Sequence, residues 1–296
     1  MVQLRPCSSE SVDVVGRSAS AAWLGRAAVF WSMILWSSSN WPPAKSTSSS
    51  AAAVGGGCPR ACFCNTPSKI VYCSRRGLTA IPDGIAGDTL QLNLNGNTFE
   101  ASTVRPSNLS HYAAMEHLYM SECGIEAIEV GAFADLTALR WLDMSNNRLR
   151  VVDAFTFAGL TLQHLFLNGN RNIRLVAESF DGLATNGLYL HDCALAAVQP
   201  EVFEPLNATL RYLWLNGNEL ERVDRRLATL FARLLHLRLG FNPLQCNCEA
   251  VWLKEFYDRH ADTFKGAMPP SCLTPHRLRS RFFSELSLFD FRCQVS

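Results

Sequence analysis

The sequence predicts an α/β solenoid in which short parallel strands line one concave face. The first observation is a segment that recurs seven times, with starts 26, 24, 23, 23, 25 and 24 residues apart. The second is its pattern, apolar-x-x-Leu-x-apolar-x-x-(Asn or Cys)-x-apolar, with one extra residue in the fourth copy. The third is that two clusters of cysteines flank the copies. A fixed period of ~20–29 residues with this pattern indicates one coil per copy.

The seven copies cover the region 89–241, and the last one merges into the segment that follows. They are 89–99, 115–125, 139–149, 162–173, 185–195, 210–220 and 234–244. In each copy the first, fourth, sixth and last apolar positions should point inward and stack on their equivalents in neighbouring coils. Phe133, Phe157, Phe180 and Phe203 recur between the copies, and we expect them to fill the convex side of the core.

The Asn position should turn the chain out of each strand. A buried side-chain amide there can satisfy backbone groups of adjacent coils, so a hydrogen-bonding residue is required. Cys123 and Cys193 replace Asn in the second and fifth copies. We predict that both are buried, reduced thiols, because they lie three coils apart and ~14 Å is too far for a disulfide.

The composition excludes several kinds of partner. The chain has 296 residues, of which 48% are hydrophobic, and its formal net charge is +1. This balance gives no reason to expect nucleic acid or an anionic membrane as a partner. We also expect no cofactor, no metal and no small-molecule substrate.

Residues 1–36 resemble a secretory signal. Arg5, Arg17 and Arg26 precede the apolar run 27–36, which is too short to span a bilayer comfortably because ~20 residues are needed. We expect cleavage, with an uncleaved signal anchor as the alternative. Residues 37–57 are rich in Ser, Ala and Gly, which favours a flexible linker.

The four cysteines at positions 58, 62, 64 and 73 should close the open edge of the first coil within an N-terminal cap, 58–88. Zinc binding is the alternative for four close cysteines, although the spacing is not that of two CxxC pairs. A C-terminal cap, 242–296, carries cysteines at 246, 248, 272 and 293. Asn247 can cap a helix near 249–258, with Val251, Trp252 and Phe256 as its buried stripe.

The repeats and both caps together resemble extracellular leucine-rich-repeat proteins with cysteine-rich flanking caps, such as Slit and the membrane glycoproteins that carry immunoglobulin domains. The motifs that carry this resemblance run from CPRACFC through GLTAIPDGI to NPLQCNC. The resemblance implies a leucine-rich-repeat horseshoe in an extracellular compartment. No enzymatic activity is expected, because the chain has no GxSxG, HExxH or phosphate-loop motif. The resemblance also implies four disulfides, namely Cys58–Cys64, Cys62–Cys73, Cys246–Cys272 and Cys248–Cys293.

The candidate site is the concave face. The strand residues between the core leucines should point to solvent, and six of them are aromatic, interleaved with His117, His164 and His236. Clustered exposed aromatic side chains are typical of protein-binding surfaces. An alternative is that aromatic residues simply suit strands. The predicted binding residues are Tyr119, Trp141, Phe166, Tyr189, Tyr212 and Trp214, with Arg140, Asp143, Arg211 and Arg238 around them.

Three further expectations concern the surface. Sequons at Asn108 and Asn207 predict N-glycosylation away from the exposed strand positions. The basic run 275–281 is expected to be a solvated loop, with at most a weak contact to heparan-type polymers. His191-Asp192 is a lone pair without a nucleophile, so catalysis is not expected.

The sequence therefore predicts a secreted protein-binding module for an extracellular or cell-surface protein, in adhesion, guidance or signalling. Two alternatives stay open. One is a structural extracellular-matrix protein. The other is the truncated ectodomain of a single-pass receptor, located at the cell surface.

Overall fold

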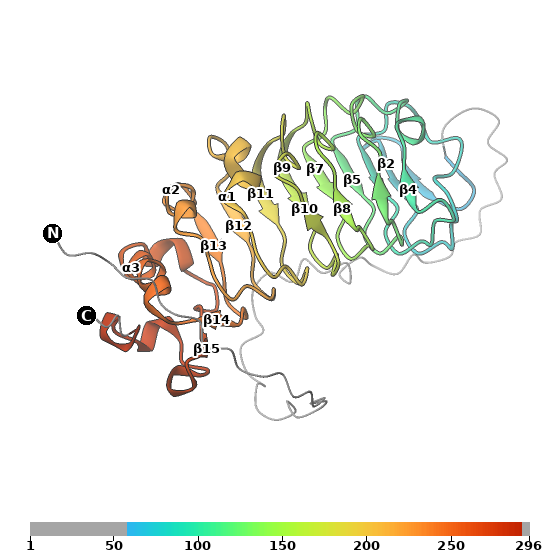
Figure 1. The fold of residues 1–296 in the computed structure, drawn as a ribbon. Helices are drawn as coiled ribbons and strands as arrows, with labels where there is room; N and C mark the ends of the chain where they lie inside the picture. The colour runs from blue at the N-terminus through green and yellow to red at the C-terminus, as the bar shows by residue number, and fades with distance from the viewer. Residues whose placement is uncertain (1–57, 292–296) are drawn as a thin grey trace. The chain divides into compact units, whose positions relative to one another are not determined.

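The computed structural model describes residues 58–291, all of which belong to one compact unit, Ala53–Ser296. The predicted signal (1–36), the predicted linker (37–57) and Cys293 lie outside the described residues. The main feature of the unit is a nine-stranded sheet in the order β1-β2-β3-β5-β7-β9-β11-β12-β13 (Figure 1). Its strands are β1 (Phe63–Asn65), β2 (Ile70–Tyr72), β3 (Gln91–Asn93), β5 (His117–Tyr119), β7 (Trp141–Asp143), β9 (Thr161–Phe166), β11 (Ala184–Tyr189), β12 (Tyr212–Trp214) and β13 (His236–Arg238).

The seven predicted copies each supply one strand of this sheet, from β3 to β13, and these strands are parallel. The second core leucine of each copy is in register with its equivalents, for example Leu142 with Leu165 and Leu165 with Leu188. Both leucines of each pair are fully buried. The predicted solenoid with a parallel sheet is therefore confirmed.

The sheet also includes two strands from the N-terminal cap, which the periodicity does not predict. β1 and β2 form an antiparallel hairpin, and β2 pairs in parallel with β3. The hairpin covers the edge of the first coil, so that this edge is not left as an unpaired strand. Cys58 is bonded to Cys64 and Cys62 to Cys73, which ties the hairpin together.

Opposite the sheet, the chain forms short strands and helical turns. The strands are β4 (Thr103–Val104), β6 (Ala127–Ile128), β8 (Val151–Val152), β10 (Arg174–Leu175), β14 (Leu244–Gln245) and β15 (Cys272–Thr274). They pair as β4–β6, β8–β10 and β14–β15. The helices are α1 (Pro200–Phe203), α2 (Ala228–Phe231) and α3 (Val251–Arg259), with 3₁₀ turns at Pro106–Asn108, Glu204–Leu206, Arg225–Leu227, Cys248–Ala250, Ala261–Phe264, His276–Leu278, Phe283–Glu285 and Leu288–Phe291.

The phenylalanine column fills the core on the side away from the sheet, as predicted. Phe133, Phe157, Phe180 and Phe203 are each at most 1% exposed. Their ring centroids are 6.0–6.5 Å apart from coil to coil. Each ring therefore contacts the ring of the next coil, and the convex side has a continuous apolar filling.

The asparagine position links adjacent coils through buried hydrogen bonds. The Asn147 amide donates to the Met120 carbonyl at 2.8 Å, and its oxygen accepts from the Cys123 N–H at 2.9 Å. Asn97, Asn170, Asn218 and Asn242 make equivalent bonds. Cys123 and Cys193 are buried and not disulfide-bonded, and each thiol lies within 3.4 Å of a carbonyl of the preceding coil. Burial raises the pKa of Cys123 to about 11 and that of Cys193 to about 12.

The C-terminal cap is bonded through Cys246 and Cys272. The pairing of Cys248 with Cys293 stays a prediction, because Cys293 lies outside the described residues. Asn247 accepts a hydrogen bond from the Glu249 N–H at 3.0 Å, at the start of the helical segment that leads into α3. The predicted buried stripe of this helix is wrong in part. Phe256 is buried, but Leu253 and Lys254 are buried with it, whereas Val251 and Trp252 are half-buried.

Candidate functional site

The exposed face of the sheet carries the predicted aromatic side chains on five adjacent strands, β5 to β12. Tyr119, Trp141, Phe166, Tyr212 and Trp214 are each half-buried. The parallel register sets Trp141 opposite His117 and His164, and it sets Phe166 opposite Asp143 and Tyr189. The alternation of the pleat explains this arrangement, because the leucines between these residues point into the core.

Four of these aromatic side chains form a continuous series of ring contacts. The Trp141 and Phe166 centroids are 4.8 Å apart, and Phe166 stacks on Tyr189 at 4.2 Å with nearly parallel rings. Tyr189 meets Trp214 edge-on at 4.7 Å. The Arg238 guanidinium lies 3.7 Å from the centroid of the Trp214 ring. Such a cation–π contact holds both side chains in place. We call Trp141, Phe166, Tyr189 and Trp214 the aromatic row.

Tyr189 differs from the other members of the aromatic row. It is only 6% exposed, so the expectation that all six aromatic side chains face solvent is wrong for this residue. Its ring lies between Phe166 and Trp214, and its hydroxyl reaches the side chain of His164. Burial raises the pKa of Tyr189 to about 12. Tyr189 therefore supports the aromatic row from within.

Of the four charged residues predicted around the site, three form hydrogen bonds within the chain, and the fourth, Arg238, packs on Trp214. The Arg140 guanidinium donates to the backbone carbonyls of Leu139 and Thr161. The Arg211 guanidinium donates likewise to Leu210 and Ala208. Asp143 accepts a hydrogen bond from the Ser145 N–H at 2.9 Å. These contacts stabilise the turns next to the strands and leave fewer groups for a partner.

Asp143 and the neighbouring tyrosine lie in a poorly solvated environment. Burial raises the pKa of Asp143 above its ordinary value, against the lowering effect of the Ser145 hydrogen bond. Burial, and then the Asp143 carboxyl, raise the pKa of Tyr119 to about 12. The pKa values of two histidines of the face shift in the opposite direction. Burial lowers the pKa of His164 and that of His191, which favours their neutral forms.

Two residues of the face were missed by the periodicity argument. His191 lies two residues after Tyr189, beyond the end of β11. Its ring packs on Trp214 with 5.5 Å between ring centroids. Tyr72 in β2 is in register with Asn93 and stacks with Phe63 at 6.1 Å. The alternating run IVY in the cap is the signal that indicates this additional strand.

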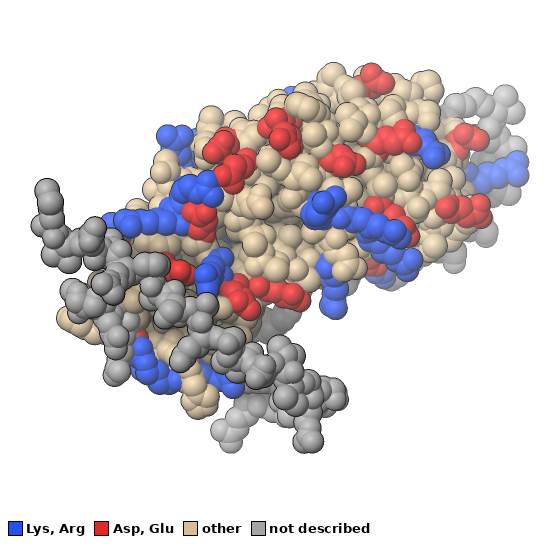
Figure 2. Space-filling model, in the orientation of Figure 1, with Lys and Arg blue, Asp and Glu red and all other residues tan. Residues whose placement is uncertain are grey.

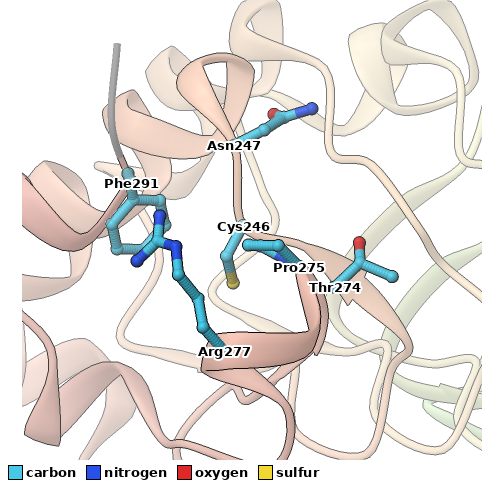
Figure 3. A pocket seen from close by; sticks show the side chains of 6 residues that line it. All are labelled: Cys246, Asn247, Thr274, Pro275, Arg277 and Phe291. Atoms are coloured by element: carbon cyan, nitrogen blue, oxygen red, sulfur yellow. The ribbon is translucent and has the colours of Figure 1, made fainter. Parts of the chain in front are cut away.

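A cavity of about 330 Å³ lies in the C-terminal cap, and its lining residues are labelled in Figure 3. It is lined by Cys246, Asn247, Thr274, Pro275, Arg277 and Phe291. The Arg277 guanidinium is already engaged, because it donates to the Asp290 carbonyl. Among residues 58–291, no cluster of three or more His, Cys, Asp or Glu side chains has a geometry that holds a metal ion.

The predicted sequons and basic run lie on loops. Asn108 ends the 3₁₀ turn Pro106–Asn108 and is exposed, and Asn207 directly follows another 3₁₀ turn and is half-buried. In the basic run, the Arg281 guanidinium donates to the Glu285 carbonyl. Within the described range, no helix has both the length and the apolar character needed to cross a bilayer.

Comparison with known protein families agrees with this architecture. Residues 113–171 match the family model for the leucine rich repeat, and residues 57–85 match the model for the leucine rich repeat N-terminal domain. The chain has the fold of a leucine-rich-repeat solenoid. The first model covers coils two to four of the solenoid, and the second covers the disulfide-bonded hairpin. The two matched ranges contain β1, β2, β5, β7 and β9 of the large sheet.

Several curated proteins are similar to this leucine-rich-repeat chain. Trophoblast glycoprotein from Macaca fascicularis is 27% identical over 292 residues, which cover 80% of this chain and 67% of that protein. Biglycan from Canis lupus familiaris is 27% identical over 215 residues, covering 64% and 55% of the two chains. CD180 antigen from Homo sapiens is 23% identical over 199 residues, covering 67% of this chain and 23% of its own length.

A solved structure shows the same fold. The crystal structure of human trophoblast glycoprotein aligns with a TM-score of 0.58 at 22% sequence identity, covering 81% of this chain and 100% of that one. The chain spans 67% of its trophoblast glycoprotein relative but under a third of CD180 antigen and of reticulon-4 receptor-like 1 from Mus musculus. The disulfide-bonded caps fit an extracellular or cell-surface location, where disulfides persist.

Proposed function

We propose that this chain is a non-catalytic, extracellular protein-binding module that recognises a protein ligand or receptor with the exposed face of its large sheet. The observation that carries the proposal is the aromatic row, in which four rings on four adjacent strands contact one another in sequence. Protein-binding hot spots are enriched in Trp and Tyr, because these side chains offer a large contact area at low conformational cost.

The partial exposure of the aromatic row favours a role in binding over a purely structural role. A row that only stabilised the sheet would gain most from complete burial, yet Trp141, Phe166 and Trp214 remain half-exposed. Arg238 holds the Trp214 ring from one side, which lowers the entropy that a partner would have to remove on binding. The relatives point in the same direction, since one of them is named a receptor-like protein.

The test is a binding screen of the secreted chain against cell-surface and matrix proteins. The wild type is compared with a Trp141→Ala/Trp214→Ala variant. The matched control is Phe155→Ala/Phe289→Ala, which removes two aromatic side chains that are 51% and 91% exposed outside the large sheet. We expect a partner that binds the wild type and the control, and that loses at least about tenfold in affinity for the Trp141/Trp214 variant.

A structural role in the extracellular matrix predicts the opposite result. In that case the Trp141/Trp214 variant would bind as well as the wild type, and affinity would depend on the caps. Unchanged affinity, at an unchanged melting temperature, would therefore refute the proposed binding face.

A further inference from the structure

A group of four arginines lies on the flank of the third and fourth coils, away from the aromatic row. Arg148 and Arg171 directly follow Asn147 and Asn170, so they occupy equivalent positions in adjacent coils. Arg150 and Arg174 are also on adjacent coils, because the Arg174 N–H donates to the Arg150 carbonyl at 2.9 Å. All four side chains are exposed. We call these four residues the arginine patch.

The geometry of the coils sets the spacing within the arginine patch. Adjacent coils are ~4.8 Å apart, and residues two apart in an extended segment are about 7 Å apart on the same side. Leu149 and Ile173, which lie between the arginines, are buried. Figure 2 shows blue side chains gathered over the region that Figure 1 labels β8 and β10, below red side chains.

The positive charge of the arginine patch is only partly balanced. Glu126 pairs with Arg150 at 2.6 Å between Oε2 and Nη2. Among the described residues, no carboxylate lies within 4 Å of the guanidinium groups of Arg148, Arg171 or Arg174. Like charges on neighbouring strands repel one another, so this arrangement costs stability in the absence of a counter-charge. An anion bound across both coils would remove that cost.

We propose that the arginine patch binds a sulfated polysaccharide chain. Guanidinium groups pair well with sulfate and carboxylate oxygens, because their donors form a planar fork that matches two oxygens at once. Of the nine large apolar side chains that are exposed in the described residues, only Phe155 belongs to the third or fourth coil. A protein partner needs apolar anchors at the centre of its interface, whereas a polyanion binds through charge alone. The chemistry therefore favours the polysaccharide over an acidic protein.

This surface is separate from the basic run 275–281, where the guanidinium groups of Arg277 and Arg281 already donate to backbone carbonyls. It is also separate from the aromatic row, since Arg174 is in β10 and Arg150 directly precedes β8, and neither strand belongs to the large sheet. The inference consequently does not depend on the proposed binding face.

The test measures binding of the purified full chain to heparin as a function of salt. An Arg148→Gln/Arg171→Gln/Arg174→Gln variant leaves the Arg150–Glu126 pair intact. The control, Arg60→Gln/Arg76→Gln/Arg279→Gln, removes the same charge from three other exposed arginines, one of them in the basic run. We expect the patch variant to lose at least about tenfold in affinity near physiological salt and to show a shallower salt dependence, because fewer counterions are released. The control should keep most of the affinity.

A second variant gains function, which misfolding cannot imitate. Glu126→Gln removes the carboxylate that occupies Arg150, so heparin affinity should rise above that of the wild type. Desulfated heparin and hyaluronan should bind far more weakly than heparin, because the dense sulfates supply the charge. The Trp141→Ala/Trp214→Ala variant should bind heparin normally.

Three results would overturn the inference. One is a wild type that does not bind heparin. Another is a patch variant that binds as tightly as the control. The third is equal binding of sulfated and unsulfated polymers, which would show that the sulfates are not recognised.

Discussion

The Tyr189 hydroxyl lies 3.0 Å from Nδ1 of His164, in the space that Gly187 leaves open. A Cβ atom on Gly187 would come within 2.5 Å of Nδ1 of His164 and 3.0 Å of the Tyr189 hydroxyl. The glycine therefore allows the Tyr189 ring to lie across its own strand, between Phe166 and Trp214 in the aromatic row. This contact explains why one aromatic side chain of the face is buried while its neighbours are half-exposed.

Gly187→Ala should therefore separate His164 from Tyr189 and destabilise the fold by about 1–3 kcal/mol, because the added methyl group overfills a packed site. Denaturant unfolding measures this loss. In a Gly187→Ala/His164→Ala double variant the methyl group has room, so the two changes should cost less together than the sum of their separate costs. Additive costs would contradict the proposed steric contact.

Stability should fall as the pH drops below about 6.5, through the half-buried His164 of the face. The pKa of His164 is lower in the folded state than the ordinary value of ~6.5, so the unfolded state takes up the proton more readily. Protonation then favours unfolding from about pH 6.5 down to the folded-state pKa, and the contribution is constant above that window. Melting temperatures between about pH 5 and 8 test this.

The comparison variant is His164→Gln, which can still bond to Tyr189 but does not titrate. Its melting temperature should decline less on acidification than that of the wild type. His111→Gln, at an exposed position outside the sheet, is the control. If the melting temperature of His164→Gln fell on acidification as much as that of the wild type, other groups would cause the acid sensitivity.

Phe157→Ala should destabilise the solenoid by about 3–5 kcal/mol, because the ring is fully buried between Phe133 and Phe180. Phe155 lies two residues earlier and is 51% exposed. Phe155→Ala should change the free energy of unfolding by only about 0.5 kcal/mol. Guanidinium titrations with the disulfides intact distinguish the two variants. Equal losses in the free energy of unfolding would mean that the phenylalanine column does not stabilise the convex side of the core.

Asn147→Ala should cost about 2–4 kcal/mol, because it leaves buried backbone groups of Cys123 and Met120 without partners. Asn147→Cys should cost less. The chain itself places cysteine at this position in two other coils, where the thiol lies within 3.4 Å of a carbonyl of the preceding coil. Thermal unfolding of both variants gives their order of stability. A cysteine variant that is less stable than the alanine variant would contradict this account.

The periodicity predicts the coil register, the buried leucine columns and the phenylalanine column, because these positions depend only on spacing and side-chain type. It also leads to the aromatic residues of the face. It does not predict that Arg140 and Arg211 donate to nearby carbonyls. The local loop geometry decides whether a long side chain bonds to a backbone carbonyl or extends into solvent. The periodicity does not predict that β1 and β2 extend the sheet either, because their pairing depends on the disulfides and the edge of the first coil.

The amino-acid sequence alone decides how many coils form, which residues are buried between them and where the caps begin, because each coil repeats the same short-range pattern. Which side chains of the sheet remain accessible is settled only when the coils stack. Tyr189 is buried because Gly187 and His164, from its own and the preceding strand, leave it that space. The arginine patch likewise exists only because stacking brings Arg148 and Arg150 beside Arg171 and Arg174, which lie over twenty residues later in the chain.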